Sequence, residues 1–374
     1  MLHNKILYSY NDVMIEPAVL SNISSRSECI ATLDGTDNMM PLFTAPMSTV
    51  VNERNYEIFK KNGIYPILPR NIDVNIRFEY ATHGEWAAFS LQEFKKLFCD
   101  DYNMGINPNV INDYKVLVDV ANGHMSILYD LVRKAKKIHG NKITIMIGNI
   151  ANPKTYFECY RAGVDYIRCG IGAGNGCISS SNVSIHYSMA SLIDEVYQEK
   201  INTYRHNNFL NKTWNEMPKI IADGGVRNYS DVIKAYALGS DYVMIGSVFA
   251  SLLESAGTTF EKRDDGSFYY YELNKINDYT KFLNEHKIYP LYKEFYGMAS
   301  REGQIAINGK KTKTSEGIRK ELPVTGTILQ WSENMNAYLR SAMSYCNIKD
   351  IKDFNPENVV VNVISSETKN SINK

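Results

Sequence analysis

Eight short apolar runs recur along the chain, separated by stretches with the periodicity of amphipathic helices. The runs occupy residues 42–47, 65–70, 87–90, 116–121, 144–149, 166–172, 219–225 and 242–247. Their centres, such as VLVDVA and TIMIGN, are continuously hydrophobic rather than alternating, which is the pattern of strands buried on both faces. The alternation of such strands with helices predicts a parallel α/β fold.

The stretches between these strands carry helix start and stop signals. Asn152-Pro153 opens one helix that ends at Gly163, and Asn228 opens another that ends at Gly239. Eight strands in such repeated units predict a closed (β/α)8 TIM barrel, whose active site lies on the loops after the carboxyl ends of the strands. An open doubly wound sheet is less favoured, because no G-x-G-x-x-G opens a helix near the N-terminus with an acidic residue about 20 positions later.

Composition narrows the classes of function. The 374 residues carry 41 basic and 41 acidic side chains, so no net field attracts nucleic acid or an acidic membrane surface. No apolar run approaches the ~18 residues that span a bilayer, and the six cysteines lack CxxC or metal-ligand spacing, so we expect a cytoplasmic protein with reduced thiols. We expect a single barrel domain over residues 1–365, an insertion at about 257–295, a mobile flap at about 299–315 and a disordered tail at 366–374.

A glycine-rich loop after the sixth strand carries the candidate nucleophile. Four glycines stand among the seven residues from Gly170 to the one before Cys177. Such density allows positive φ and close backbone approach to a ligand, while the loop holds the thiol at the barrel mouth. The alternative is a flexible surface loop with an inert thiol, but the position after a strand end favours a nucleophile.

The ends of the seventh and eighth strands offer groups for a nucleotide. Asp223 could accept hydrogen bonds from vicinal ribose hydroxyls, although a structural turn carboxylate is the alternative. The turns with Gly225 and with Gly246-Ser247 offer backbone amides for a phosphate, which this fold commonly binds after strands seven and eight.

The fourth strand ends in a carboxylate, an amide and an imidazole. Asp119, Asn122 and His124 could bind a cofactor amide or shuttle a proton, but His124 alone is more typical of a structural histidine. Arg70 and Met47 complete the rim, and Met47 could equally be a residue that fills the barrel.

Taken in order, these motifs resemble the IMP dehydrogenase/GMP reductase family over most of the chain. They are YSYNDVMIEP, SSRSE, APMSTV, LPRN, DVANGH, the loop that ends in Cys177, ADGG, IGS, FYGMAS and SEGI. The cysteine loop followed by ADGG and IGS is highly specific for that family. The resemblance implies a purine nucleoside monophosphate, GMP or IMP, as substrate and a nicotinamide cofactor.

The resemblance also implies roles for individual residues. Cys177 would attack carbon 2 of the purine to form a thioimidate, and Ser179 would take part in proton transfer. Substrate contacts would come from Met47, Asp223, Gly225, Gly246, Ser247, Tyr296, Gly297, Met298 and Glu316, and cofactor contacts from Arg70, Asp119, Asn122 and Gly170. A potassium ion could bind the carbonyl oxygens of Gly172, Gly174 and Cys177.

Several features favour the reductase branch, which uses NADPH to convert GMP to IMP. The segment between Arg70 and the third strand is too short for the regulatory CBS modules that the dehydrogenase usually carries. The segment between FYGM and SEG is also short and has no tyrosine, and DVANGH and FYGM are reductase-like. LPRN, IADGGVR and EGI are closer to the dehydrogenase, so an IMP dehydrogenase without CBS modules, using NAD, is an alternative.

The chain departs from the family pattern at two positions. Arg301 stands where the reductase has a catalytic glutamate, with Glu302 one step later, and Ser48 replaces an aspartate. We assign Ser179 and Glu302 as the pair that protonates departing ammonia, since an amide anion is a poor leaving group. If these departures abolish proton transfer, the chain would be a catalytically silent purine-nucleotide-binding protein. The resemblance further implies a homotetramer.

Overall fold

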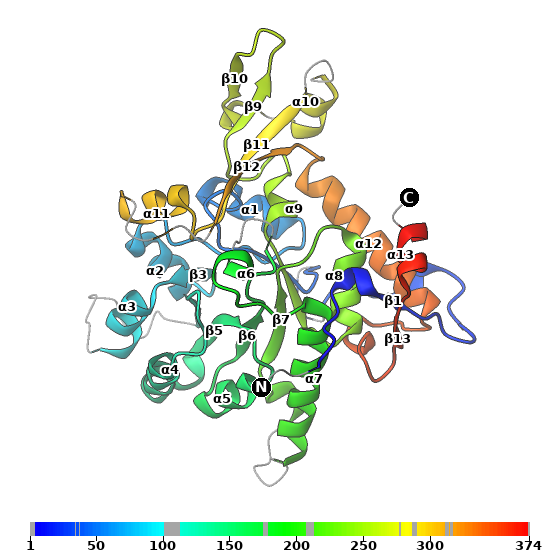
Figure 1. Ribbon diagram of the computed structural model, residues 1–374. Helices are drawn as coiled ribbons and strands as arrows, with labels where there is room; N and C mark the ends of the chain where they lie inside the picture. The colour runs from blue at the N-terminus through cyan, green and yellow to red at the C-terminus, as the bar shows by residue number, and fades with distance from the viewer. Residues whose placement is uncertain are drawn as a thin grey trace.

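Seven parallel strands form most of a curled sheet at the centre of the molecule (Figure 1). The computed structural model describes residues 4–33, 35–36, 38–100, 113–174, 179–206, 213–276, 278–285, 290–310, 314 and 317–372. The strands are β2 (Leu42–Thr44), β3 (Trp86–Phe89), β4 (Tyr114–Asp119), β5 (Ile143–Ile150), β6 (Tyr166–Cys169), β7 (Lys219–Asp223) and β8 (Tyr242–Ile245). Their order in the sheet is β2-β8-β7-β6-β5-β4-β3.

The gap between β2 and β3 is closed by residues 65–68. Pro66 and Pro69 have no backbone N–H, so the strand expected at 65–70 is reduced to two isolated parallel bridges. The bridges join Tyr65 to Phe43 and Leu68 to Ala87. Seven strands and this segment together fill the eight strand positions of the barrel, and the predicted (β/α)8 barrel is confirmed.

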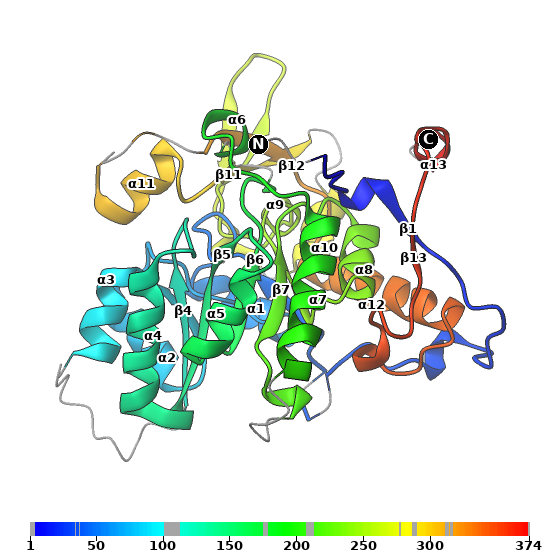
Figure 2. The ribbon, with the colours of Figure 1, turned by 60° about the horizontal axis from the view of Figure 1, so that its bottom comes forward.

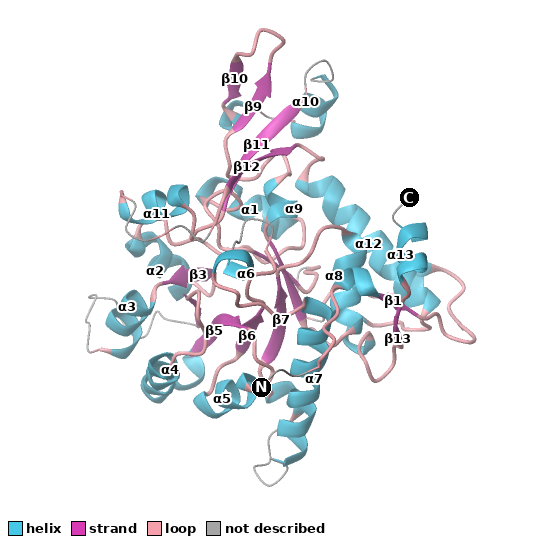
Figure 3. Cartoon of the chain, in the orientation of Figure 1, coloured by secondary structure: helices cyan, strands magenta, loops and turns pink. Residues whose placement is uncertain are grey.

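Helices surround the barrel, as the ribbon coloured by secondary structure shows (Figure 3). One helix follows each of the eight strand positions. In chain order they are α1 (Glu53–Lys61), α2 (Val74–Thr82), α3 (Leu91–Phe94), α4 (Ser126–His139), α5 (Thr155–Ala162), α7 (Met189–His206), α8 (Tyr229–Ala237) and α12 (Ile328–Tyr345). The predicted end signals act as expected. Gly163 ends α5 in the left-handed conformation, with φ of 83°, and the Asn228 side chain caps α8 by accepting a hydrogen bond from the backbone N–H of Asp231.

Aromatic side chains fill one end of the barrel. Trp86, Tyr166 and Tyr242 are the first residues of their strands, and the Phe43 ring centroid lies 5.6 Å from that of Trp86 and 5.1 Å from that of Tyr242. The amino-terminal end of the barrel is therefore packed with rings. Polar side chains meet instead at the carboxyl-terminal end.

The insertion after β8 forms a sheet of its own. Its strands are β9 (Thr259–Lys262), β10 (Phe268–Tyr271), β11 (Leu291–Tyr296) and β12 (Arg319–Pro323), in the antiparallel order β10-β9-β11-β12. The short helices α9 (Ser247–Ala250) and α10 (Tyr279–Glu285) belong to the same excursion, and the hairpin of β9 and β10 projects away from the barrel (Figure 1). Within the segment expected to be a mobile flap, residues 301–308 form α11 (Arg301–Asn308).

The two ends of the described chain pair with each other. The strand β1 (Val13–Ile15) is antiparallel to β13 (Val361–Val363), and it follows a single helical turn, η1 (Tyr10–Asp12). Residues 366–372, for which the sequence predicts a disordered tail, form the helix α13 (Ser366–Ile372) beside that turn (Figure 1). Within the described residues, no helix is both long and apolar enough to cross a bilayer.

Candidate functional site

The carboxyl ends of β4, β5, β6 and β7 bring four polar side chains together. Arg168 of β6 lies between two carboxylates: its Nη1 donates to Asp119 Oδ1 at 2.8 Å, and its Nη2 and Nε donate to Asp223 Oδ2 at 2.8 and 3.0 Å. Asn149 Nδ2 donates to the same Asp223 oxygen at 2.7 Å. The Arg70 guanidinium approaches Asp119 Oδ2 from the rim, at 3.8 Å. The network is well shielded from solvent, since the Arg168 side chain is 8% exposed.

This network leaves one oxygen of Asp223 available. All its hydrogen bonds go to Oδ2, and Oδ1 accepts none from the residues that the structure describes. Burial alone would lower the pKa of Arg168, but the charges of Asp223 and Asp119 outweigh it and raise that pKa above its usual value. Asp223 is therefore held in place by a charged guanidinium, while its Oδ1 accepts no hydrogen bond from the part of the chain that the structure describes.

Sequence reasoning missed Arg168 and Asn149. Arg168 is a charged residue inside an otherwise apolar strand, YIRC, and this was the signal that could have revealed it. Asn149, near the end of TIMIGNI, also donates to the Gly170 carbonyl at 2.8 Å and so connects β5 to the start of the cysteine loop.

Glycines let the loops after β6 and β7 touch. At Gly170, with φ of 143°, a Cβ would lie 2.0 Å from the Asp223 carbonyl oxygen, so only glycine fits. The backbone N–H of Gly225 donates to the Ala173 carbonyl at 3.0 Å. The start of the cysteine loop is thus bound directly to the turn that follows Asp223.

The candidate nucleophile itself lies outside the described residues, as does Glu316. The described flanks of the loop end at Gly174 and resume at Ser179, the first residue of α6 (Ser179–Asn182). Of the three carbonyls expected to bind a cation, those of Gly172 and Gly174 are on described residues and that of Cys177 is not. Among described residues, no group of three or more His, Cys, Asp or Glu side chains could hold a metal ion.

The loop after β2 meets the segment that follows β11. The backbone N–H and Oγ of Ser48 lie 3.4 and 3.6 Å from Met298 Sδ, and Thr49 Oγ1 donates to the Tyr296 carbonyl at 3.4 Å. Met47 Sδ lies beside Gly246, where an added Cβ would be 3.2 Å away. Met47 and Met298, the two methionines expected to contact the purine base, therefore lie on one side of the barrel mouth. They are next to the turn before Ser247, the first residue of α9.

The helix α11 packs closely on the same segment. A Cβ at Gly303 would lie 2.5 Å from the Gly297 carbonyl oxygen and 2.6 Å from Met298, and Ser300 Oγ caps the helix by accepting from the Gly303 N–H at 3.0 Å. Glu302, half-buried, is in this first turn, while Arg301 is exposed. Figure 2 shows α6 and α11 at the same end of the barrel.

The loop after β4 contains a structural histidine. His124 Nε2 accepts from the Ala151 N–H at 3.1 Å, so the proton is on Nδ1, which donates to Thr155 Oγ1 at 3.1 Å. Burial lowers the pKa of His124 and favours this neutral form. Asn122 uses its Oδ1 to accept from the His124 N–H and is otherwise exposed, so its amide is open to a ligand.

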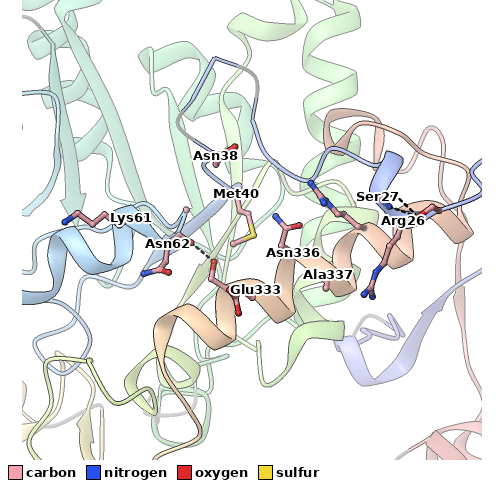
Figure 4. Close-up of a pocket in the computed structure, with 13 residues that line it drawn as sticks. Arg26, Ser27, Asn38, Met40, Lys61, Asn62, Glu333, Asn336 and Ala337 are labelled. Atoms are coloured by element: carbon pink, nitrogen blue, oxygen red, sulfur yellow. Dashed lines mark hydrogen bonds between the residues drawn. The ribbon is translucent and has the colours of Figure 1, made fainter. Parts of the chain in front are cut away.

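A separate cavity of about 560 Å³ lies away from these groups. It is lined by Arg26 and Ser27 of the SSRSE motif and by Asn336 of α12, among others (Figure 4). Met40 and Gly63, which also line the cavity, come just before β2 and before the bridged segment at 65–68. The cavity is therefore at the amino-terminal end of the barrel strands. The chemistry of this fold belongs at the opposite end, where the carboxylates and glycine turns meet.

Comparison with known proteins identifies the family of this chain. The sequence model of the IMP dehydrogenase / GMP reductase domain matches residues 110–373. The chain is 27% identical to a GMP reductase of Staphylococcus aureus (strain JH9) over 364 residues, which covers 95% of this chain and 96% of that protein. It is 27% identical to a GMP reductase of Variovorax paradoxus (strain S110) over 359 residues, with 95% of each covered. The family expected from the motifs is confirmed, and the chain belongs to the IMP dehydrogenase/GMP reductase family.

Proposed function

We propose that this protein is a GMP reductase, which converts GMP to IMP with NADPH through a covalent bond between Cys177 and carbon 2 of the purine. The observation that carries the proposal is the arrangement at the mouth: an oriented Asp223, whose Oδ1 accepts no hydrogen bond from the described residues, joined through Gly170 and Gly225 to the cysteine loop. The names of the relatives, which the chain matches over nearly their whole length, support the reductase branch.

The nucleotide would be held by three sets of groups. Asp223 Oδ1 would accept from a ribose hydroxyl, because Arg168 and Asn149 already occupy Oδ2. The amides of Gly225, Gly246 and Ser247 would receive the phosphate, with Tyr296 and Gly297 beside it. Met47 and Met298 would contact the base, and Glu316 would read its N1 edge.

The groups beyond Asp119 fit a nicotinamide cofactor. Asn122 has an exposed amide, and the Asp119 carboxylate and the Arg70 guanidinium lie next to each other at the rim, so acceptors and donors for a carboxamide are present. The backbone at Gly170 would lie between the cofactor and the base. When bound, the cofactor supplies the hydride.

The chain's own residues would carry the covalent and proton-transfer steps. The Cys177 thiolate adds to carbon 2, and the amino group leaves as ammonia once Glu302, aided by the Ser179 hydroxyl, has delivered a proton to its nitrogen. After hydride has reached carbon 2, the carbon–sulfur bond breaks and the thiolate returns, which releases IMP. The first turn of α11 carries Glu302 and packs through Gly303 on Met298, which supports a general acid on the side of the purine base.

The first test follows absorbance at the NADPH band. We expect GMP-dependent NADPH oxidation, and we expect Cys177→Ala to abolish it while GMP binding persists. Cys346→Ala removes another thiol, one whose pKa burial raises, and should keep full turnover. Glu302→Gln should lower kcat by about 10²–10⁴-fold, the usual contribution of a general acid.

Two results would overturn this assignment. Formation of XMP from IMP and NAD would move the protein to the dehydrogenase branch. Tight GMP binding without turnover would make it a silent nucleotide-binding protein, which is the reading that Arg301 favours. The potassium site, the homotetramer and the cytoplasmic location implied by the resemblance stay predictions.

A further inference from the structure

The helical turn η1 near the N-terminus and the start of α7 pack against the turns at Gly225 and Gly170 of the candidate site. Tyr10 of η1 is 2% exposed, and its ring lies 3.5 Å from where a Cβ of Gly225 would be. Met189, at the start of α7, contacts both turns: its side chain is 3.0 Å from such a Cβ at Gly225 and 3.1 Å from one at Gly170. Tyr10 and Met189 therefore pack against the turn at Gly225, the turn proposed to bind the phosphate and called the phosphate turn below.

Hydrogen bonds join the segment that carries Tyr10 to the helices α7 and α8 of the barrel. The Lys234 ammonium of α8 donates to the Tyr10 carbonyl at 3.0 Å. The backbone N–H of Tyr8 donates to Ser191 Oγ at 2.8 Å, and the Ser191 N–H donates back to the Tyr8 carbonyl at 3.1 Å, which joins the segment to α7. The Tyr10 hydroxyl has no hydrogen-bond partner among the described residues, so its contribution is that of a ring.

Asp12 closes the turn that carries Tyr10. Its Oδ2 accepts from the Ser9 N–H at 2.6 Å and from Ser9 Oγ at 2.7 Å, and its own N–H donates to the Ser9 carbonyl at 3.0 Å. These bonds fix the geometry of η1 locally. Asp12 therefore decides how Tyr10 is presented to Gly225.

The C-terminal segment holds Asp12 from the other side. The ammonium of Lys369 on α13 pairs with Asp12 Oδ1, and the Ile364 N–H donates to the Asp12 carbonyl at 2.9 Å. The pairing of β1 with β13, from Val13 opposite Val363 to Ile15 opposite Val361, continues the same contact. Figure 1 and Figure 2 both show α13 beside the start of β1.

Resting on the proposed function, we propose that Lys369 and Tyr10 are positioning residues for the phosphate of the bound nucleotide. Lys369 holds Asp12, Asp12 holds the turn of Tyr10, and Tyr10 supports Gly225 in its left-handed conformation, with φ of 75°. No step of the reaction needs either side chain. Their removal acts on the geometry of the phosphate turn, at a distance from the base.

The charge state of Asp12 agrees with this role. Burial opposes ionisation of the carboxyl, but the hydrogen bonds from Lys369 and Ser9 outweigh it and lower the pKa of Asp12. A group with a lowered pKa contributes its stability above its ordinary pKa and loses it only as the pH falls through the folded value. The contact is thus intact at neutral pH and would open only in acid.

The test compares Lys369→Ala with Lys369→Arg, and with Lys275→Ala as a matched control. Lys275 is a more exposed lysine, and among the described residues it forms a local ion pair, with Glu272 in the insertion. Titration calorimetry would measure the affinity of each variant for GMP and for guanosine, which lacks the phosphate. We expect Lys369→Ala to weaken GMP binding about two- to fivefold and Tyr10→Ala up to about thirtyfold, the range for residues that act through others. Guanosine affinity should not change, and Lys369→Arg and Tyr10→Phe should bind GMP as the wild type does.

Hydrogen exchange of the ligand-free protein tests the mechanical link independently of the reaction. In Lys369→Ala the amide of Gly225, which donates to Ala173, should exchange faster than in the wild type, together with amides of residues 8–12. Unchanged exchange at Gly225, or equal weakening of GMP and guanosine, would overturn the proposal. A wild-type protein that binds no purine nucleotide would instead refute the proposed function, and the exchange experiment would still decide whether the C-terminal helix controls this turn.

Discussion

At the scale of single residues, the feature that organises the site is Arg168. One guanidinium satisfies two carboxylates on different strands, and its planar fork suits this task in a way that an ammonium does not. Because the three side chains are largely buried, removing this cation leaves Asp223 with the neutral Asn149 amide and Asp119 with the more distant Arg70 guanidinium, in a medium of low polarity.

Arg168→Met tests this argument, because it keeps an apolar stem and removes the charge. We expect the free energy of unfolding to fall by about 3–5 kcal/mol, as for a buried ion pair that loses one partner. The measurement is equilibrium unfolding in urea. Arg161→Met is the matched control, since its pair with Glu158 on α5 is exposed and should contribute about 0–1 kcal/mol. Equal effects of the two substitutions would contradict the central role of Arg168.

At the scale of elements, the inserted sheet depends on one buried lysine. Lys293 of β11 is 0% exposed, and its Nζ is within hydrogen-bond distance of the carbonyl oxygens of Leu253 and Ser255, at 3.0 and 2.8 Å, and of Thr259 Oγ1, at 2.8 Å. These acceptors lie in the segment from the end of β8 to the start of β9. The lysine therefore fixes the sheet to the barrel, and with it Tyr296 at the far end of β11.

Lys293→Met should make the protein less stable by about 1–3 kcal/mol at pH 9, because the buried carbonyl and hydroxyl oxygens around Nζ lose their hydrogen-bond partner. Burial lowers the pKa of Lys293 well below its usual range, and Arg54 adds to this effect. The amine thus binds a proton more tightly in the unfolded chain than in the folded protein, and near pH 7 this proton uptake favours unfolding. The effect disappears as the pH rises toward about 10, the pKa of lysine in the unfolded chain. The stability difference between wild type and variant should therefore grow from pH 7 to pH 10.

Thermal unfolding across this pH range measures the effect. The control is Lys281→Met on α10, an exposed lysine whose loss should leave the pH profile unchanged. A variant that is more stable than the wild type at every pH would show that desolvation of the amine outweighs its three hydrogen bonds.

At the scale of the whole molecule, the site is assembled from loops distant in sequence. The loops after β2, β4, β6 and β7 and the segment after β11 meet at one end of the barrel, and aromatic rings fill the other end. A nucleotide bound there would contact most of these loops at once. Binding should therefore stabilise the molecule as a unit, as it does for any ligand that binds only the folded state.

We expect GMP at 100 times its Kd to add about 2.7 kcal/mol to the free energy of unfolding. For a chain of 374 residues that corresponds to a rise in Tm of about 3–4 °C. Differential scanning calorimetry with GMP, IMP and guanosine at matched concentrations provides the measurement. A shift of equal size with guanosine would argue against a phosphate site at Gly225 and Gly246.

Much of the fold could be predicted because its signals are local. Continuous apolar runs, glycine after α5 and asparagine before α8 act through near neighbours, so they predicted the strands and helices in order. The glycine turns at Gly170 and Gly225 were also visible, since a close approach of backbones permits no other residue. The strand expected at 65–70 is shorter than its hydrophobic pattern predicts, because its two prolines lack the backbone N–H groups that a strand ladder needs.

Local patterns along the chain establish the periodic framework, the family and the positions where loops carry polar groups. Which of those polar groups touch follows from the folded arrangement alone. Arg168 bridges Asp119 and Asp223, 49 and 55 residues away, and Lys369 reaches Asp12 from 357 residues away. Pairings of this kind depend on burial and on the closing of the barrel, and neither is encoded in any local pattern.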